Sequence, residues 1–257
     1  MTTALRAEWT KQRTLAGPAW LLLTATLLTV GLGALVAASM HCPIAHCGVD
    51  TTKISLTGVQ LGQAVVAVLA VLSVGNEYST GMIQTTIAAI PRRGIMLAAK
   101  AAVVSGPVLV AGAVAALGSI LAGRLILPGQ GFDAAHGYAP LSLADGPTLR
   151  ATGGAVLYLV LIGLLSLGLA TLVRDSAASI GVVLGLLYLV PLLISAISDK
   201  HLHRHLEQIS PQSGLNIMTT LNVHDLSLSP WQGLGVLALW AVGALLVGGL
   251  VLRLRDA

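Results

Sequence analysis

The sequence predicts an all-α protein that crosses a membrane with six helices, and two observations lead to this fold class. Of its 257 residues, 55% are hydrophobic and 9% are charged, whereas an ordinary soluble domain carries about 25% charged residues. Six apolar windows fill most of the chain, and each is close to the roughly 20 residues that a membrane-spanning helix needs. Six spans leave no length for a second globular domain, so we expect residues 1–257 to form a single transmembrane domain.

The six windows follow from the hydropathy of the chain, whose mean is +0.87. Each is long enough to span the hydrocarbon layer and lacks the charge density of a water-facing segment. The predicted spans are residues 18–38, 58–75, 97–121, 152–173, 177–197 and 231–252.

The orientation is predicted from the distribution of Lys and Arg, because an excess of these residues stays on the cytoplasmic face. With the N-terminus inside, nine of the basic residues are cytoplasmic and five are outside. Both termini of a six-span chain then lie in the cytoplasm. The nine are Arg6, Lys11, Arg13, Arg92, Arg93, Lys100, Arg174, Arg253 and Arg255, and the five are Lys53, Arg124, Arg150, Lys200 and Arg204.

The segment before the first window, residues 1–16, predicts an amphipathic helix at the membrane surface. Trp9 lies among the cations Lys11 and Arg13, a combination that suits the headgroup layer. The alternative is a disordered tail. The apolar window that follows is longer than the core of a typical signal peptide, so we expect it to be retained as an anchor.

Cys42 and Cys47, the only cysteines, fall in the first predicted outer loop. An oxidising exterior allows them to form a disulfide, and the four intervening residues make a feasible small loop. The alternatives are two free thiols, or metal capture together with His41 and His46. A bond that closes so short a loop is expected to stabilise the loop only locally.

The apolar windows lack the residues that membrane chemistry usually requires. All seven histidines lie outside them, and the acidic residues lie in connections or at helix ends. This argues against a membrane haem protein, a proton-coupled transporter and an intramembrane protease. His201, His203 and His205 are placed to bind zinc or copper on a helix or a strand, but a solvated outer loop is the simpler interpretation, and we predict no metal site.

No phosphate-binding loop of the Gly-x-x-x-x-Gly-Lys-Ser/Thr type occurs in the chain. We therefore expect a transport subunit that is not itself an enzyme and that has no cofactor of its own. If ATP powers the protein, ATP and Mg²⁺ bind to a separate chain.

The longest predicted cytoplasmic connection, residues 75–93, has the features of a short rigid helix. Ile83, Ile87 and Ile90 recur at helical spacing. Pro91 would end that helix, and Arg92 with Arg93 would anchor its exit at anionic lipid. The alternative is an ordinary solvated loop.

Within this connection, Glu77-Tyr78-Ser79-Thr80-Gly81, then Thr85-Thr86, then Ala89-Ile90-Pro91-Arg92-Arg93 resembles the first inner loop of type-2 ABC exporter permeases. The opening residues 7–14, Ala-Glu-Trp-Thr-Lys-Gln-Arg-Thr, also resemble the amphipathic N-terminal helix of that family. With the six-span layout, the resemblance covers effectively the whole chain.

The resemblance implies a permease that forms a homo- or heterodimer and docks cytoplasmic ABC ATPase subunits through residues 77–90. Glu77 would cap the coupling helix or pair with a basic residue of the ATPase, and Thr80 and Gly81 would set its first turn. Met82, Ile83 and Ile87 would fill the groove of the ATPase, beside Tyr78. Family members also carry short re-entrant helices before the last span, but the polarity of residues 199–230 argues against deep re-entry here.

The sequence therefore predicts the membrane subunit of an ATP-driven exporter of amphipathic compounds such as a drug, an antibiotic or a peptide. The abundance of Ala, Gly, Val and Arg suggests a bacterial cell membrane. The dispersed basic residues form no nucleic-acid surface. A structural or sensory membrane protein that binds partners without transport is the alternative from a different class, and a membrane enzyme is disfavoured by the missing catalytic residues.

Overall fold

The computed structural model describes residues 2–14, 16–43, 47–79, 81–82, 93–221 and 223–254. These residues contain no strand, and six of their helical segments are long and apolar enough to cross a membrane. The predicted all-α, six-span fold class is therefore confirmed. The six segments are Ala16–Ser39, Thr51–Tyr78, Gly94–Gln130, Gly146–Val173, Ser176–Ser195 and Pro230–Leu254.

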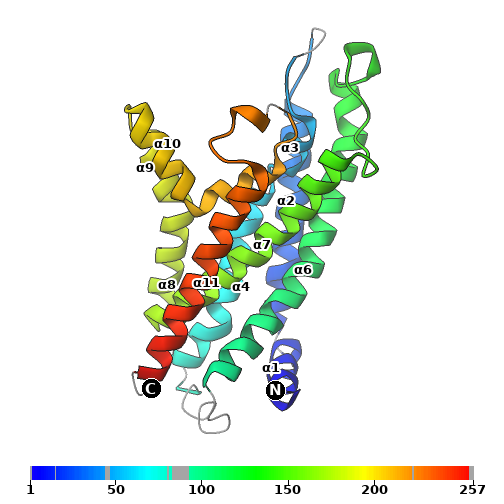
Figure 1. The fold of residues 1–257 in the computed structure, drawn as a ribbon. Coiled ribbons are helices and arrows are strands. Elements are labelled where there is room, and N and C mark those ends of the chain that lie inside the picture. Colours follow the sequence, from blue (N-terminus) through cyan, green and yellow to red (C-terminus); the bar gives the residue numbers. More distant parts are fainter. Residues whose placement is uncertain are drawn as a thin grey trace.

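The long helices follow one another along the chain as antiparallel spans, and short helices lie in several of the connections that the structure describes (Figure 1). The elements are α1 (Thr2–Thr14), α2 (Ala16–Ser39), α3 (Thr51–Leu56), α4 (Val59–Ser79), α6 (Arg93–Ile126), η1 (Leu127–Gln130), η2 (Ala134–His136), α7 (Gly146–Val173), α8 (Ser176–Leu184), η3 (Gly185–Leu189), α9 (Val190–Ser195), α10 (Lys200–Ile209), η4 (Pro211–Met218), η5 (Val223–Asp225) and α11 (Pro230–Leu254).

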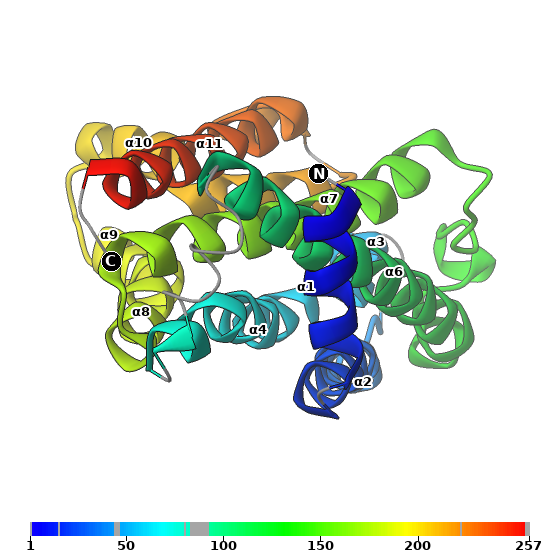
Figure 2. The same ribbon diagram turned by 90° about the horizontal axis from the view of Figure 1, so that it is seen from below.

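Both chain termini lie at the same end of the bundle, as six spans require, and the last turn of α4 and the first turn of α6 lie there too (Figure 1). We call this the termini end. The opposite end, which carries α3, α10 and the short turns η1, η2, η4 and η5, is the far end. Seen from below, α1 lies across the termini end beside α2 and α6 (Figure 2).

The core is centred on α7, which packs against α4, α6 and α11. Small residues allow two of these contacts to be close. A Cβ atom at Gly168 of α7 would lie 2.6 Å from the backbone of Ala244 in α11, and one at Gly248 of α11 would lie 2.0 Å from Thr171 Oγ1. Because lipid offers no hydrophobic drive between helices, such close backbone contact is a main source of helix association in membranes.

The fifth span is the least regular one. Its middle, Gly185–Leu189, is a π-helical turn, and Pro191 is the second residue after it. Tyr188 in this turn donates its hydroxyl proton to the carbonyl oxygen of Gln60 in α4, and Gln212 of η4 donates to the carbonyl oxygen of Leu187. These side chains bind carbonyl groups near the irregular turn, as broken membrane helices require.

Residues 199–230 enter the bundle more deeply than their polar composition predicted. η4 packs against α7 and α11 and buries Ile217 and Met218 in the core. A Cβ atom at Gly214 would lie 3.0 Å from the ring of Tyr158, and Tyr158 itself is fully buried. η4 can enter the core because its buried residues are apolar or small and it carries no charged residue.

At the far end, Cys42 and Cys47 form a disulfide with their Cα atoms 5.9 Å apart. Asp50 follows this loop and caps α3 by accepting a hydrogen bond from the backbone N–H of Lys53 at 3.0 Å. The same carboxylate accepts hydrogen bonds from the hydroxyl group of Thr220 at 2.7 Å and from the N–H of Leu221 at 2.9 Å. The first loop is thus tied to the segment that follows η4.

Candidate functional site

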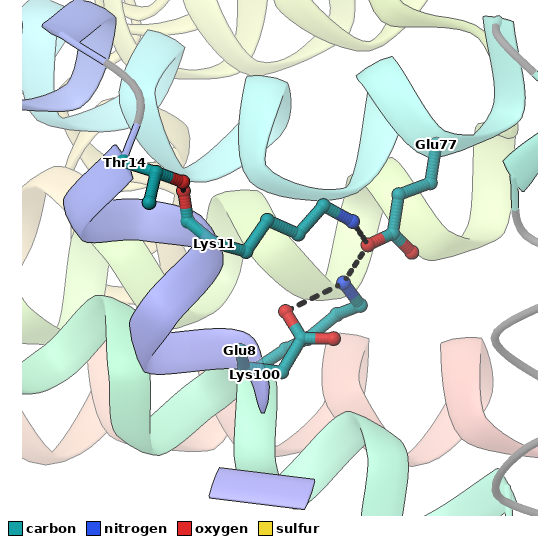
Figure 3. Close-up of polar contacts among 5 residues, drawn as sticks. All are labelled: Glu8, Lys11, Thr14, Glu77 and Lys100. Carbon is teal, nitrogen blue, oxygen red and sulfur yellow. Dashed lines mark hydrogen bonds and ion pairs between the residues drawn. The ribbon is translucent and has the colours of Figure 1, made fainter. Parts of the chain in front are cut away.

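Four charged side chains from three helices meet at the termini end and form what we call the charge cluster: Glu8 and Lys11 of α1, Glu77 of α4 and Lys100 of α6 (Figure 3). Lys100 Nζ lies 2.6 Å from Glu77 Oε1 and 3.1 Å from Glu8 Oε2. Lys11 Nζ also donates to Glu77 Oε1. Figure 3 shows the two ammonium groups converging on the carboxylate of Glu77.

The positions of these residues along their helices explain why they meet. Glu8 and Lys11 are three residues apart, so they share one face of α1. Trp9, next to Glu8, is 50% exposed, so the two faces of α1 differ as an amphipathic helix requires. Glu77 is in the last turn of α4, and Lys100 is in the second turn of α6.

The cluster is almost entirely removed from water. The side chains of Glu77 and Lys100 are 1% and 2% exposed, and that of Glu8 is 9% exposed, whereas Lys11 keeps 35% of its side-chain surface. Two carboxylates and two ammonium groups sum to zero charge, which lets the group exist in such a site, because a buried charge without a partner is costly. Glu77 Oε2 is the exception: it is buried without a hydrogen-bond partner among the described residues.

The charge cluster lies between the two ends of the connection that the sequence singles out. α4 ends at Ser79, two residues beyond Glu77, and α6 begins at Arg93, seven residues before Lys100. Because Glu77 and Lys100 are paired, the two helix ends that carry the connection are joined. α1 binds both helix ends, because Lys11 donates a hydrogen bond to Glu77 and Glu8 accepts one from Lys100.

A second contact braces the end of α4. The guanidinium carbon of Arg174 lies 5.9 Å from the ring centroid of Tyr78, a cation–π distance. Arg174 takes a left-handed backbone conformation with φ of 62° at the C-terminus of α7, and its Nη2 donates to the carbonyl oxygen of Val251 in α11 at 3.1 Å. The last turn of α4 is therefore held by α1, α6 and α7 together.

The structure gives the predicted coupling residues different environments. Glu77 and Tyr78 belong to α4 rather than to a loop, Gly81 has a φ of +70° and is exposed, and Met82 is 45% exposed. Four predicted site residues, Thr80, Ile83, Ile87 and Arg92, lie outside the described residues, as do the side chains of Arg13 and Arg93. The predicted coupling helix itself is therefore not described.

Two predicted site residues make contacts within the chain that were not expected. Glu77 was expected to cap the coupling helix or to pair with a partner's basic residue, but its side chain is buried and already binds two lysines of its own chain. Lys11 was expected to anchor the N-terminal helix to lipid, but its ammonium group binds Glu77, so it anchors α1 to the bundle as well. The sequence of α1 shows alternating charges near the N-terminus. It does not show that these side chains pair with residues of α4 and α6.

Glu8 and Lys100 are site residues that the sequence reasoning did not select. Lys100 is the one charged residue inside the third predicted window, where a lysine requires a partner. That requirement was a usable signal for a buried ion pair, since Glu8 and Glu77 are two of the four acidic residues on the same side of the predicted bundle, with Asp175 and Asp256.

The histidine cluster at the far end shows no metal-binding geometry. His201 and His205 share a face of α10, with their ring centroids 6.0 Å apart. Among the described residues, no group of three His, Cys, Asp or Glu side chains is placed to hold a metal ion. His203 instead contacts the carbonyl oxygen of Ile194 through Nδ1 at 3.0 Å.

No protein-family model matches the sequence, and no curated protein matches it.

Proposed function

We propose that the chain is the membrane subunit of an ATP-driven exporter and that a separate cytoplasmic ATPase docks on the connection between α4 and α6. The observation that carries this proposal is the charge cluster at the base of that connection. The motif Glu77-Tyr78-Ser79-Thr80-Gly81, which resembles the inner loop of type-2 ABC exporter permeases, begins inside the cluster.

The proposed mechanism is mechanical, because the chain receives its energy from the partner. A force on the connection is transmitted to α4 through Glu77 and to α6 through Lys100, and the ion pairs make the two helix ends move as one. α1 moves with them through Glu8 and Lys11. A connection with loose ends would absorb the displacement locally, so a buried, paired base supports a coupling role.

Gly81 and Met82, the described residues of the connection, are exposed and therefore available to the ATPase. Met82, 45% exposed at the start of the connection, offers an apolar contact for a groove of the partner. In this proposal Glu77 positions the connection from behind and does not touch the ATPase. Both termini and the termini end lie in the cytoplasm of a bacterial cell.

A second permease subunit completes the proposed exporter. The fifth span supports this part of the proposal, because only 17% of its apolar window is buried within the chain. A Cβ atom at Gly181 or Gly185 would meet nothing within 4 Å, so this face is open to close packing by another helix. The proposed cargo is an amphipathic compound such as a drug, an antibiotic or a peptide.

The proposal is tested by purifying the tagged chain from its native host and measuring ATP hydrolysis of the preparation. We expect an ATPase to co-purify, and we expect Met82→Glu to lower the ATPase activity about tenfold, which corresponds to about 1.4 kcal/mol of lost contact. Leu143→Glu is the matched control, because Leu143 is 39% exposed and lies in the connection before α7 at the far end.

Recovery of the folded chain without an ATPase, or equal hydrolysis by the Met82→Glu and Leu143→Glu variants, would overturn the proposal. A folded chain that binds other proteins and moves nothing would support the structural or sensory alternative instead.

A further inference from the structure

A cavity of about 400 Å³ lies beside the charge cluster, between α1, α2 and α4. Its size falls within the range of roughly 300–1,000 Å³ that is typical of small-molecule sites. Its apolar walls come from α2 and α4 and from the start of the connection: Pro18, Leu21, Leu69, Leu72 and Met82. α1 closes the remaining side.

The polar lining of the cavity is concentrated on α1 and on the last turns of α4. Glu8 and Glu77 contribute carboxylates that are buried and each bind Lys100 through one oxygen, while Glu77 Oε2 has no hydrogen-bond partner among the described residues. Lys11 also lines the cavity and keeps 35% of its side-chain surface. Its ammonium group has three donors and gives one to Glu77, so the most exposed charged group that lines this cavity is a cation.

The surroundings of the cavity match the boundary of a bilayer. Trp9 is 50% exposed, and Arg6 is exposed on the same short helix, a combination that favours the headgroup layer. The apolar surface of α2 begins just beyond, with Trp20 66% exposed and Leu23 47% exposed. A ligand with an apolar chain and an anionic head therefore matches the apolar walls of this cavity and its position at the boundary of the bilayer.

We propose that this cavity binds a phospholipid with a negatively charged headgroup, with one acyl chain against Leu21, Leu69 and Leu72 and with its phosphate near Lys11 and Gln12. This inference concerns a ligand of the chain itself and does not depend on the proposed ATPase. The bound lipid fills the space between α1 and α4 and holds α1 against the bundle in addition to the ion pairs.

The test uses the full-length chain in phosphatidylcholine vesicles that contain a small fraction of phosphatidylglycerol with a photoreactive diazirine in one acyl chain. After illumination, mass spectrometry maps the labelled peptides. Phosphatidylcholine with the same photoreactive chain is the comparison probe. We expect the anionic probe to label the peptides of Leu21 and Leu72 about fivefold more than the zwitterionic probe, since one cation near an anionic surface contributes about 1 kcal/mol.

Three variants separate a defined site from general attraction to the membrane. Leu72→Trp fills the apolar part and is expected to abolish labelling by both probes. Gln12→Glu adds a negative charge at the polar end and is expected to reduce anionic labelling to the zwitterionic level. Thr14→Glu adds the same charge to α1 at an exposed position outside the cavity, and is expected to leave the labelling unchanged.

Equal labelling by the two probes in the unmodified chain would overturn the inference, as would labels that map elsewhere. An equal effect of Gln12→Glu and Thr14→Glu would also overturn it, because it would reveal attraction to the surface of α1 as a whole.

Discussion

Lys100 is the residue whose surroundings define the charge cluster. It lies inside a membrane-spanning helix, 2% exposed, between a carboxylate of α1 and a carboxylate of α4. A buried ion pair contributes less to stability than its distances suggest, because both partners lose their hydration. Breaking such a pair on one side is much more costly, since an uncompensated charge then stays buried.

This asymmetry predicts the behaviour of a Lys100→Met variant. We expect the free energy of unfolding to fall by about 3–5 kcal/mol, because, among the described residues, Glu8 loses its ion-pair partner and Glu77 keeps Lys11 alone. Unfolding in a detergent or denaturant series measures the loss. The second substitution Glu8→Gln should restore part of it, since the buried carboxylate that lost its partner is then removed.

Lys53→Met serves as the control, because Lys53 is exposed at the far end. A similar loss in the Lys53 and Lys100 variants would show that the charge cluster is not the cause. A Lys100→Met variant as stable as the unmodified chain would contradict the pairing itself.

At the scale of single helices, the pattern of apolar windows was sufficient to predict all six spans. It could not predict the helix ends, because polar residues extend a helix wherever tertiary contacts satisfy them. α4 continues to Ser79 since Glu77 and Tyr78 find partners on other helices, and α6 begins at Arg93 rather than at residue 97. The π-helical turn at Gly185–Leu189 is contacted by Gln212 of η4, which is distant in sequence, so the turn could not be predicted from local sequence.

The candidate site was predicted only in part for the same reason. The connection after α4 was recognisable from its motif, but the partners of Glu77 are set by how α1 crosses the bundle, and hydropathy does not contain that geometry. Glu77 was expected to lie at the surface of the bundle, but its side chain is buried inside the bundle.

The close packing of α11 on α7 predicts that a larger residue at Gly248 of α11 destabilises the protein. A Cβ atom at Gly248 would lie 2.8 Å from the carbonyl oxygen of Gly168 and 2.0 Å from Thr171 Oγ1, so Gly248→Ala must push the two helices apart. We expect a loss of about 1–3 kcal/mol in the free energy of unfolding, the usual cost of overpacking. Thermal unfolding in detergent measures it.

Gly235→Ala is the matched control on the same helix, because a Cβ atom there would meet nothing within 4 Å. That substitution is expected to be neutral or to stabilise α11 slightly, since alanine favours a helix over glycine by about 1 kcal/mol. The opposite order of the two effects would contradict the close contact between α7 and α11.

At the scale of the whole molecule, both termini and the connection after α4 share one end of the bundle, and the disulfide lies at the other (Figure 1). The proposed orientation puts the termini end in the cytoplasm. In a Cys42→Ser, Cys47→Ser background, we expect Met82→Cys to resist a membrane-impermeant maleimide on intact cells and to react after lysis. His224→Cys, exposed at the far end, is expected to react on intact cells, and the reverse pattern would invert the orientation.

The central claim is that the connection held by the charge cluster receives its displacement from a separate ATPase. It is tested most directly by cross-linking from Met82→Cys, in the same cysteine-free background, with a short bifunctional reagent in native membranes. The account predicts a covalent product between the chain and an ATPase that contains a phosphate-binding loop, and no such product from His224→Cys. Transport by the purified chain alone, with no ATPase cross-linked at residue 82, would contradict it.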